Sequence, residues 1–405
     1  SNLFGAVTQS LRRFFIYALS PILYNAGIII CIIFFYPRLG LVGLVWGVAL
    51  GAFFHLAIQW PTVARHGLFP RLIQTLNWSE LRRVVWLSLP RTLGLGAGQL
   101  TTAVLVSIAS LISTGAIAIF NFANNLQSVP LTIIGVSYSV AAFPTLVHLF
   151  TNGERERFLE QVTTTIRHVL FWALPTAVLF IVLRAQIVRV ILGSGHFSWS
   201  DTRLTAAALA LFVLSLVAQS LVLVLVRAYY SSGQTKRPLL VNVLSAIITV
   251  ALALVFWRIL VAASGPRFFL ESLLRVNDLG GTAVLALPLA FSLGSGLNIW
   301  LLWQLFQRDF GRFPKMVDKA LWQSVAASLA GGVAAYFVLN LLDDFLDLDT
   351  FLGIFTQGLV AGLFGLLVST LILWRLDNKE IKEIARSLHH KFWHSRPIAP
   401  EPEGL

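Results

Sequence analysis

The chain has 405 residues, of which 57% are hydrophobic and 12% are charged, with a formal net charge of +12 and a mean hydropathy of +0.79. Soluble domains carry roughly a quarter of their residues as charged side chains, so this composition excludes an ordinary soluble domain. The single cysteine, Cys31, excludes a disulfide framework and a cysteine-based metal site. The only methionine is Met316, and we see no cleavable signal peptide, so we expect a processed or truncated piece of a longer protein.

Apolar segments long enough to cross about 30 Å of hydrocarbon as helices recur along the whole chain. They predict an all-α, polytopic membrane protein with about ten transmembrane helices. We place these helices at 13–36, 41–61, 84–112, 117–149, 168–190, 203–230, 238–262, 281–306, 320–342 and 351–374.

The loops between these segments alternate in charge. The basic loops hold Arg65, Arg71, Arg82, Arg83, Lys236, Arg237, Arg308, Arg312, Lys315 and Lys319, whereas the loop at 341–349 is acidic. Because basic loops stay on the cytoplasmic side, both termini of the chain are predicted to be cytoplasmic. This topology explains the net positive charge and requires no nucleic acid as a partner.

Two charged segments are predicted to lie outside the hydrocarbon. The segment 154–171 becomes amphipathic along its length, which predicts an interfacial helix before the fifth span. The tail at 378–397 places Ile381, Ile384 and Leu388 at helical spacing against basic residues. It is expected to be either a helix on anionic lipid headgroups or a solvated helix, with a disordered end after residue 397.

A polar stripe interrupts the fourth span. Its side chains recur at i, i+3, i+4 and i+7 and so share one helix face: Asn121, Asn124, Asn125 and Ser128. Ser128 is expected about 18 Å into the helix, near mid-membrane, and Pro130 after it predicts a kink. An unsatisfied amide facing lipid costs several kcal/mol, so the stripe indicates either a polar cavity or hydrogen bonds between helices.

The preceding span carries a second polar face. Arg91, Gly94, Gly98 and Thr102 share it, and Gln99 lies in the same span. Gly94 and Gly98 form a GxxxG pair, which predicts close helix packing. An intramembrane arginine marks either a cavity or an anion site, although the shallow depth of Arg91 also allows it to reach the interface. The candidate binding residues are therefore Arg91, Gln99, Thr102 and the polar stripe.

Motifs for other chemistry are not found in the sequence. It contains no HExxH motif, no His/carboxylate metal spacing and no Ser/His/Asp set, so we expect no catalytic site, metal or cofactor. The external acidic residues Asp343, Asp344, Asp347 and Asp349 are interpreted as a consequence of topology. Gly358 and Gly362 in the last span predict helix docking.

Four stretches occur in an order that resembles a known family. They are LPRTLGLGAGQL, NFANNLQSVPLTIIGVSYSVAAFPTL, ILGSGHFSWSDTRLTAAAL and LVRAYYSSGQTKRPLLVNVL. Together they resemble the MurJ/MviN family of lipid II flippases, within the superfamily of multidrug and oligosaccharidyl-lipid exporters. The segment RAYYSSGQTKRP is the most specific part of this resemblance, and its basic residues and Pro238 are typical of a cytoplasmic turn between two helices.

The resemblance implies a two-lobed flippase fold. Family members have fourteen spans, in two six-helix lobes around a central cavity plus two helices that form a groove for the lipid tail. The spans of this chain match the fifth to the fourteenth, so the N-terminal lobe is expected to be incomplete. Residues 1–83 then supply the last two helices of that lobe and a cytoplasmic loop, 84–319 the C-terminal lobe, 320–376 the groove pair and 377–405 a cytoplasmic amphipathic or disordered tail.

The resemblance also implies a function. Family members move the lipid-linked peptidoglycan precursor, lipid II, from the cytoplasmic to the external leaflet of the plasma membrane by alternating access. The implied partners are lipid II and membrane lipids, and the implied state is a monomer. The helix with the polar stripe matches the helix that lines the cavity in the family.

The stripe departs from the family pattern. Well-studied members carry an Asp–Arg pair where this chain has Asn124 and Asn125, and an acidic residue where it has Ser128. Amides hydrogen-bond phosphates and sugars but supply no charge, so Arg91 is the candidate replacement. This neutral face keeps two alternatives open: export of another lipid-linked oligosaccharide, and a degenerate homologue that does not transport. A membrane enzyme would need carboxylates or a metal site.

Overall fold

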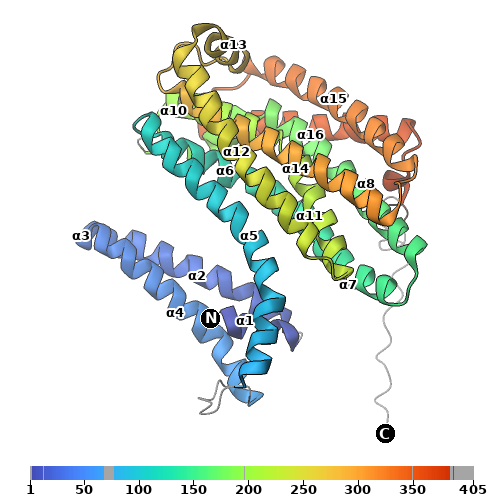
Figure 1. Cartoon of the computed structure of the whole chain (residues 1–405). Coiled ribbons are helices and arrows are strands. Elements are labelled where there is room, and N and C mark those ends of the chain that lie inside the picture. Colours follow the sequence, from blue (N-terminus) through green and yellow to red (C-terminus); the bar gives the residue numbers. More distant parts are fainter. Residues whose placement is uncertain are drawn as a thin grey trace. The chain divides into compact units, whose positions relative to one another are not determined.

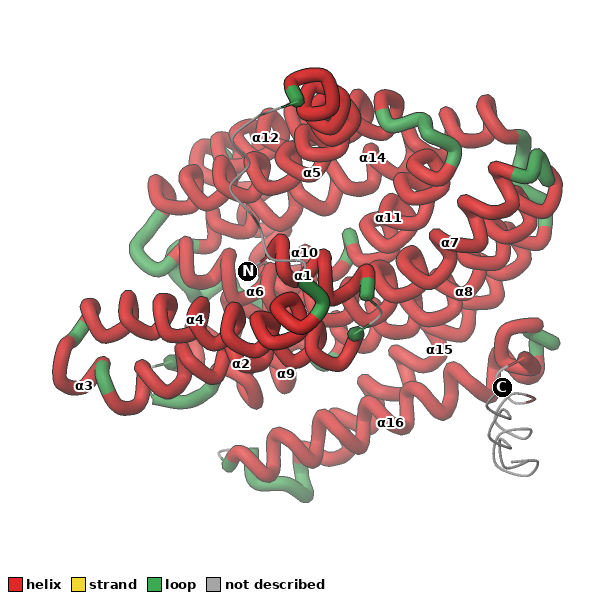
Figure 2. The backbone as a smooth tube through the Cα atoms, turned by 90° about the horizontal axis from the view of Figure 1, so that it is seen from below, coloured by secondary structure: helices red, strands yellow, loops and turns green. Residues whose placement is uncertain are grey.

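The computed structural model describes residues 2–11, 13–67, 77–195, 197–348, 350–383 and 386. Every regular element in these residues is helical, which confirms the all-α class (Figures 1 and 2). The predicted positions of Arg71, Asp349, Ile384 and Leu388 lie outside the described residues. The chain divides into two compact units, Ser1–Arg83 and Val84–Leu405.

The first unit is built on a closely packed helix pair. Its helices are α1 (Asn2–Ser10), α2 (Phe14–Phe34), α3 (Tyr36–Leu39) and α4 (Leu41–Arg65). A Cβ added at Gly51 of α4 would lie 2.4 Å from the Tyr24 carbonyl oxygen of α2. A Cβ added at Gly27 of α2 would lie 2.7 Å from the Gly51 Cα. The absence of side chains at these glycines lets two backbones touch, as is common between membrane helices.

The second unit holds the remaining helices. They are α5 (Trp78–Ile112), which begins just before the unit boundary, α6 (Ala116–Leu131), the π-helical turn η1 (Thr132–Val136), α7 (Ser137–Thr151), α8 (Arg155–Val182), α9 (Arg184–Leu192), α10 (Trp199–Val213), α11 (Leu216–Ser231), α12 (Lys236–Ala262), α13 (Ser264–Leu274), the 3-10 turn η2 (Thr282–Leu285), α14 (Ala286–Phe310), α15 (Met316–Asp343) and α16 (Phe351–Arg375).

Eight of the described helices are long and apolar enough to cross a membrane. The pair α10–α11, bent by 40°, is a ninth if it forms one span. The described apolar part of α5, Gly96–Ile112, is shorter than a full span. The ten predicted segments thus correspond to eight clear spans, one bent pair and one helix with a shorter apolar part.

The fourth predicted span continues past its proline. Residues Ala116–Thr151 form one continuous apolar span, in which α6 is followed by η1 and then α7. Pro130 has no N–H to donate within the helix, and the turn directly after it is π-helical. The kink predicted at Pro130 stays a prediction, and the change observed there is this wider turn. Gly135 in the turn lies against α11, because a Cβ there would stand 2.9 Å from the Ser220 hydroxyl.

The prediction of a separate interfacial helix at 154–171 is wrong. These residues form the first part of α8, which continues without a break to Val182. Val162, Ile166 and Val169 recur on one face and are completely buried in the core shared with α7, α11 and α14. The amphipathic pattern is real, but protein rather than lipid headgroups covers its apolar face.

The α11–α12 turn, which lies within the segment RAYYSSGQTKRP, is bonded to α14. The Tyr229 hydroxyl donates to Asp309 Oδ2 at 2.9 Å, and Arg237 forms an ion pair with the same carboxylate. Gly233, with φ of 76°, closes the turn between these two side chains. The segment therefore fastens the α11–α12 connection to α14.

The α15–α16 hairpin packs along α8 (Figures 1 and 2). A Cβ at Gly358 would lie 3.1 Å from Gln186 Cβ, and a Cβ at Gly362 would lie 3.1 Å from a Leu183 methyl group. The predicted docking role of these two glycines is confirmed.

The tail does not start as a free segment. Asn378 and Glu380 are buried, so the first residues of the predicted 377–405 tail pack on the helices of the second unit. The prediction of a solvated or lipid-bound tail is wrong for these residues, because Glu380 pairs with a buried arginine of α8. Of the rest of the tail, 384–385 and 387–405 lie outside the described residues.

Close packing of α12 on α14 gives a stability test. We expect Gly294→Ala to destabilise the protein by about 1–3 kcal/mol, because the new methyl group would stand 1.9 Å from the Thr249 hydroxyl oxygen. Gly296→Ala, in the same helix, places its methyl group in open space. Alanine is the better helix former by about 1 kcal/mol, so this control should keep or raise the Tm. Thermal unfolding in detergent measures the Tm of both variants. A Tm of Gly294→Ala equal to that of Gly296→Ala would contradict the close packing of α12 on α14.

Candidate functional site

Helix α6 is fixed in the second unit by one apolar face. It begins after Gly115, whose φ of 86° turns the chain back from α5. Its buried side chains include Ile119, Phe120 and Ala123, and it packs mainly on α10. Phe120 contacts Phe212 of α10 edge-on, with ring centroids 5.2 Å apart. This packing decides which face of α6 is left open.

The polar stripe lies on the face of α6 away from this core. Asn125 is exposed, and Asn121, Asn124 and Ser128 are half-buried. The Ser128 hydroxyl donates to the Asn125 carbonyl oxygen at 2.7 Å, within the same helix. Within the described part of the second unit, no stripe side chain hydrogen-bonds to another helix. These contacts favour a polar surface over hydrogen bonds between helices as the role of the stripe.

Gln127 is a polar residue whose burial the sequence pattern did not indicate. It lies off the stripe, and its side chain is 1% exposed with no partner for its Nε2 atom. A buried amide donor without a partner costs about 1–3 kcal/mol. The helical angle between Gln127 and the stripe was the one signal available, and it indicates only that Gln127 faces elsewhere.

Among the described residues, no hydrogen bond joins the α5 candidates to the stripe. Gln99 is exposed, and the half-buried Thr102 donates from its hydroxyl to the Gly98 carbonyl oxygen at 3.2 Å. The backbone of Arg91 belongs to α5, but its side chain lies outside the described residues. The prediction of close packing at Gly98 is wrong for the described residues, since a Cβ there would meet nothing within 4 Å.

A small polar pocket lies inside the second unit. Its volume is about 230 Å³, and it is lined from α5, α6, α11, α12 and α14. Asn298 Nδ2 donates to Asn242 Oδ1 at 3.1 Å, while the Ser245 hydroxyl and Asn298 Oδ1 have no partner. No ionisable side chain lines the pocket, so its chemistry is neutral hydrogen bonding, which suits ordered water. The sequence could not indicate it, because five helices contribute to it.

An apolar pocket lies between α6, η1 and α8. It has a volume of about 440 Å³ and is lined by Val129, Pro130, Ile133, Ile134, Tyr138, Trp172, Thr176 and Phe180. Val129 follows Ser128 directly in the chain, but a helix turns 100° per residue, so the pocket opens on another face of α6 than the stripe. None of the stripe residues lines it.

The site has no arrangement for metal chemistry among the described residues. No group of three or more His, Cys, Asp or Glu side chains that could hold a metal ion occurs in them. The stripe itself contains only amides and one hydroxyl, which donate and accept hydrogen bonds without titrating at neutral pH.

A protein-family model decides the family. The model described as "Lipid II flippase MurJ" matches residues 1–356. The chain belongs to the MurJ lipid II flippase family. It is accordingly a multi-pass membrane protein of a transporter family, and this family is the one that its sequence resembles.

Curated relatives carry the same description. The probable lipid II flippase MurJ of Bdellovibrio bacteriovorus is 32% identical over 255 residues, covering 62% of this chain and 49% of the relative. The protein of that name from Buchnera aphidicola subsp. Schizaphis graminum is 28% identical over 322 residues, covering 77% of this chain and 57% of the relative. The chain thus spans about half the length of the curated relatives it matches.

A solved structure has the same fold. The lipid II flippase MurJ in an inward closed conformation superimposes with a TM-score of 0.66 and 20% sequence identity. The match covers 89% of this chain and 68% of that chain. At this identity the likeness concerns the fold.

Cysteine labelling tests whether the stripe faces water. In a Cys31→Ser background, we expect Asn125→Cys to react with a water-soluble maleimide at least tenfold faster than Val129→Cys. Both positions are exposed, but a thiol ionises and reacts in water and stays inert against hydrocarbon. Gln127→Cys is the buried control. Equal protection at 125 and 129 in native membranes would show that the stripe faces lipid or protein.

Proposed function

We propose that this chain, within the protein to which it belongs, moves lipid II from the cytoplasmic to the external leaflet by alternating access. The observation that carries the proposal is the open amide stripe on a helix that belongs to a membrane-length apolar span. Membership of the MurJ family supports the choice of lipid II as the transported lipid.

The stripe is suited to a sugar–diphosphate headgroup. Each asparagine offers two N–H donors and a carbonyl acceptor, and Ser128 adds a hydroxyl. Three amides on neighbouring turns can therefore bond several hydroxyl, amide or phosphate oxygens at once. Such bonds are individually weak and reversible, which fits a carrier that must also release its substrate.

The hydrocarbon part of the substrate would lie on apolar surface. We assign residues 320–376, the α15–α16 hairpin with its connections, to the lipid-tail groove, residues 84–319 to the C-terminal lobe and residues 1–83 to the last two helices of the N-terminal lobe. The apolar pocket between α6 and α8 would receive part of the tail, because its lining is almost entirely hydrocarbon.

The remaining assignments follow from the same reading. We place the protein in the plasma membrane with both ends of this chain cytoplasmic, since loops rich in Lys and Arg alternate with loops that hold few basic residues. Transport of this kind breaks no covalent bond, so we propose that the protein is not an enzyme. We also propose that it acts as a monomer in contact with membrane lipids, as the family resemblance implies. We assign Arg91, Gln99 and Thr102 to the headgroup site together with the stripe.

A second candidate function is export of another lipid-linked oligosaccharide. It is favoured by Asn124, Asn125 and Ser128, which are neutral where the family resemblance implies charged side chains. A headgroup with more sugar and less charge would suit an uncharged stripe better than a diphosphate does.

Complementation tests the function. We expect the protein, expressed from its complete coding region, to rescue cells depleted of their own lipid II flippase. Lipid II should then reach the external surface of the rescued cells. Failure of rescue by a protein shown to be folded in the membrane would contradict lipid II transport and favour the second candidate or a degenerate homologue. Residues 1–405 alone, run in parallel, show what this chain does unaided.

Variants of the stripe test the site separately. Loss of one neutral hydrogen bond costs about 0.5–1.5 kcal/mol, so Asn124→Ala and Asn125→Ala should each slow flipping by about two- to tenfold, and the double variant more than tenfold. Val140→Ala, at an exposed position of α7 in the same span, is the matched control and should flip normally. Normal flipping by the double variant would exclude the stripe from the headgroup site, and normal flipping by Arg91→Ala would exclude Arg91.

A further inference from the structure

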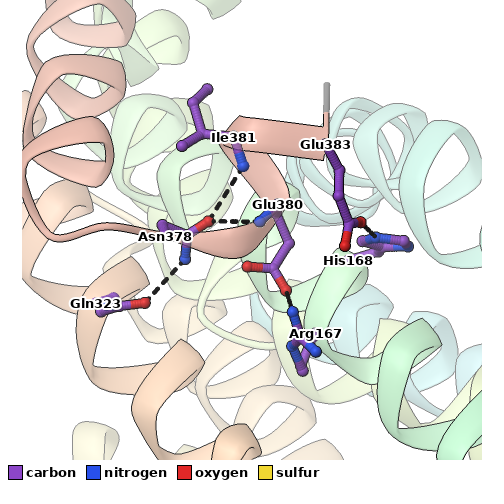
Figure 3. A network of polar contacts seen from close by, with 7 residues as sticks. All are labelled: Arg167, His168, Gln323, Asn378, Glu380, Ile381 and Glu383. Atoms are coloured by element: carbon purple, nitrogen blue, oxygen red, sulfur yellow. Dashed lines mark hydrogen bonds and ion pairs between the residues drawn. The ribbon is translucent and has the colours of Figure 1, made fainter. Parts of the chain in front are cut away.

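The chain does not leave the membrane bundle where α16 ends. After Asp377 it forms one more helical turn, 379–383, which lies against the second unit (Figure 3). Asn378 caps this turn, since its Oδ1 accepts from the backbone N–H groups of Glu380 at 3.1 Å and Ile381 at 3.3 Å. We call residues 377–383 the strap.

The strap is tied to α15 by amide hydrogen bonds. Asn378 Nδ2 donates to Gln323 Oε1 at 3.0 Å, and Gln323 Nε2 donates to the Leu376 carbonyl oxygen at 2.6 Å. One glutamine of α15 thus holds both the end of α16 and the start of the strap.

The strap is tied to α8 by a buried ion pair. Arg167 of α8 pairs with Glu380, and their side chains are 8% and 2% exposed. The apolar cluster of Phe171, Ala327 and Leu373 lies beside this pair, with Ile381 packed against it. One helical turn further along the strap, Glu383 Oε2 lies 3.4 Å from His168 Nε2 (Figure 3).

Burial makes this contact a two-state one. A charge removed from water is tolerated only while it is paired, so Arg167 and Glu380 are either joined in the docked strap or both hydrated with the strap released. A half-released strap would bury one unpaired charge. By contrast, the Glu154–Arg157 pair on the same helix has side chains 32% and 74% exposed and can open without such a cost.

The strap also connects to the wall of the apolar pocket between α6 and α8. The His168 ring lies 5.7 Å from the ring of Tyr138, and Tyr138 lines that pocket. Glu383, His168 and Tyr138 therefore form a contact path from the strap to the pocket wall. Docking of the strap fixes α16 to α8 and holds one side of the pocket in place.

We propose that the strap is a releasable fastener. Docked, it joins the end of the α15–α16 hairpin to α8 through the Arg167–Glu380 pair, and its release lets this end of the hairpin move relative to α8 during each transport cycle. The docking itself is independent of the proposed function, whereas the effect on transport rests on it.

Protease protection tests the docking. In membranes, cleavage after Lys379 and Lys382 by trypsin, followed by mass spectrometry, should become at least tenfold faster in Arg167→Met and in Glu380→Met. The double variant should be as protected as the unmodified chain, because two apolar side chains can replace a buried pair. Arg157→Ala, which breaks the exposed pair, is the matched control and should change nothing.

The double variant keeps this test valid if a single variant fails to fold. Cleavage rates of both single variants within twofold of the unmodified protein would overturn the docking role of the pair. Cleavage of the double variant as fast as that of the single variants would overturn the two-state account.

Cross-linking tests the release. In a Cys31→Ser background, His168→Cys on α8 and Glu383→Cys on the strap, whose side chains are partly exposed and in contact, joined by a bifunctional thiol reagent with a reducible spacer, should lower lipid II flipping at least tenfold, and a reductant should restore it. Flipping at the normal rate by the cross-linked protein would overturn the proposal that release is required. Absence of flipping before cross-linking would instead count against the proposed function, and the protease result would still decide the docking.

Discussion

Hydrocarbon offers no hydrogen bonds, and this constraint shapes the whole protein. Backbone groups are satisfied within helices, which explains why every described regular element is helical. Helices in lipid gain little from hydrophobic association, so they rely on close contact. Gly51 against the Tyr24 carbonyl and Gly294 against Thr249 are two examples of that contact. Against this background, each polar side chain inside a span calls for an explanation.

The structure gives three explanations for such polar groups. Some serine and threonine hydroxyls bond back to their own helix, as Thr101 does to the Ala97 carbonyl oxygen at 2.9 Å. Arg167 and Glu380 are paired across elements and fix the strap. In the described part of the second unit, the asparagine side chains of the α6 stripe neither bond back to their own helix nor pair with another element. Amides left open on a membrane-length helix are costly against hydrocarbon, and their proposed role is to bind a polar headgroup.

The sequence predicted the helices well because hydrophobic length is a local property. The positions of the spans and the shared face of Asn121, Asn124 and Asn125 required only composition and helical spacing. The interfacial helix at 154–171 was mispredicted, because an amphipathic pattern looks the same whether lipid or protein covers its apolar face. The prediction at Gly98 had the same weakness. A GxxxG spacing allows another helix to pack closely, but it does not show that a helix packs there.

Contacts between distant residues could not be predicted from one sequence. His168 and Glu383 lie 215 positions apart, and no local pattern joins them. The neutral pocket with Asn242, Ser245 and Asn298 is assembled from five helices, each of which looks unremarkable alone. Tyr229 and Arg237 stood out in the family-specific turn, but their shared partner Asp309 became visible only in the fold.

Photo-cross-linking gives the most informative single result on the stripe. A photoreactive amino acid placed at Asn125 in the complete, membrane-embedded protein would be irradiated in the presence of lipid II, with the same group at the exposed Trp199 of α10 as the comparison. A lipid II adduct at 125, absent at 199, is the predicted result. Adducts with phospholipid at 125 and none with lipid II would contradict the assignment of the stripe to the headgroup.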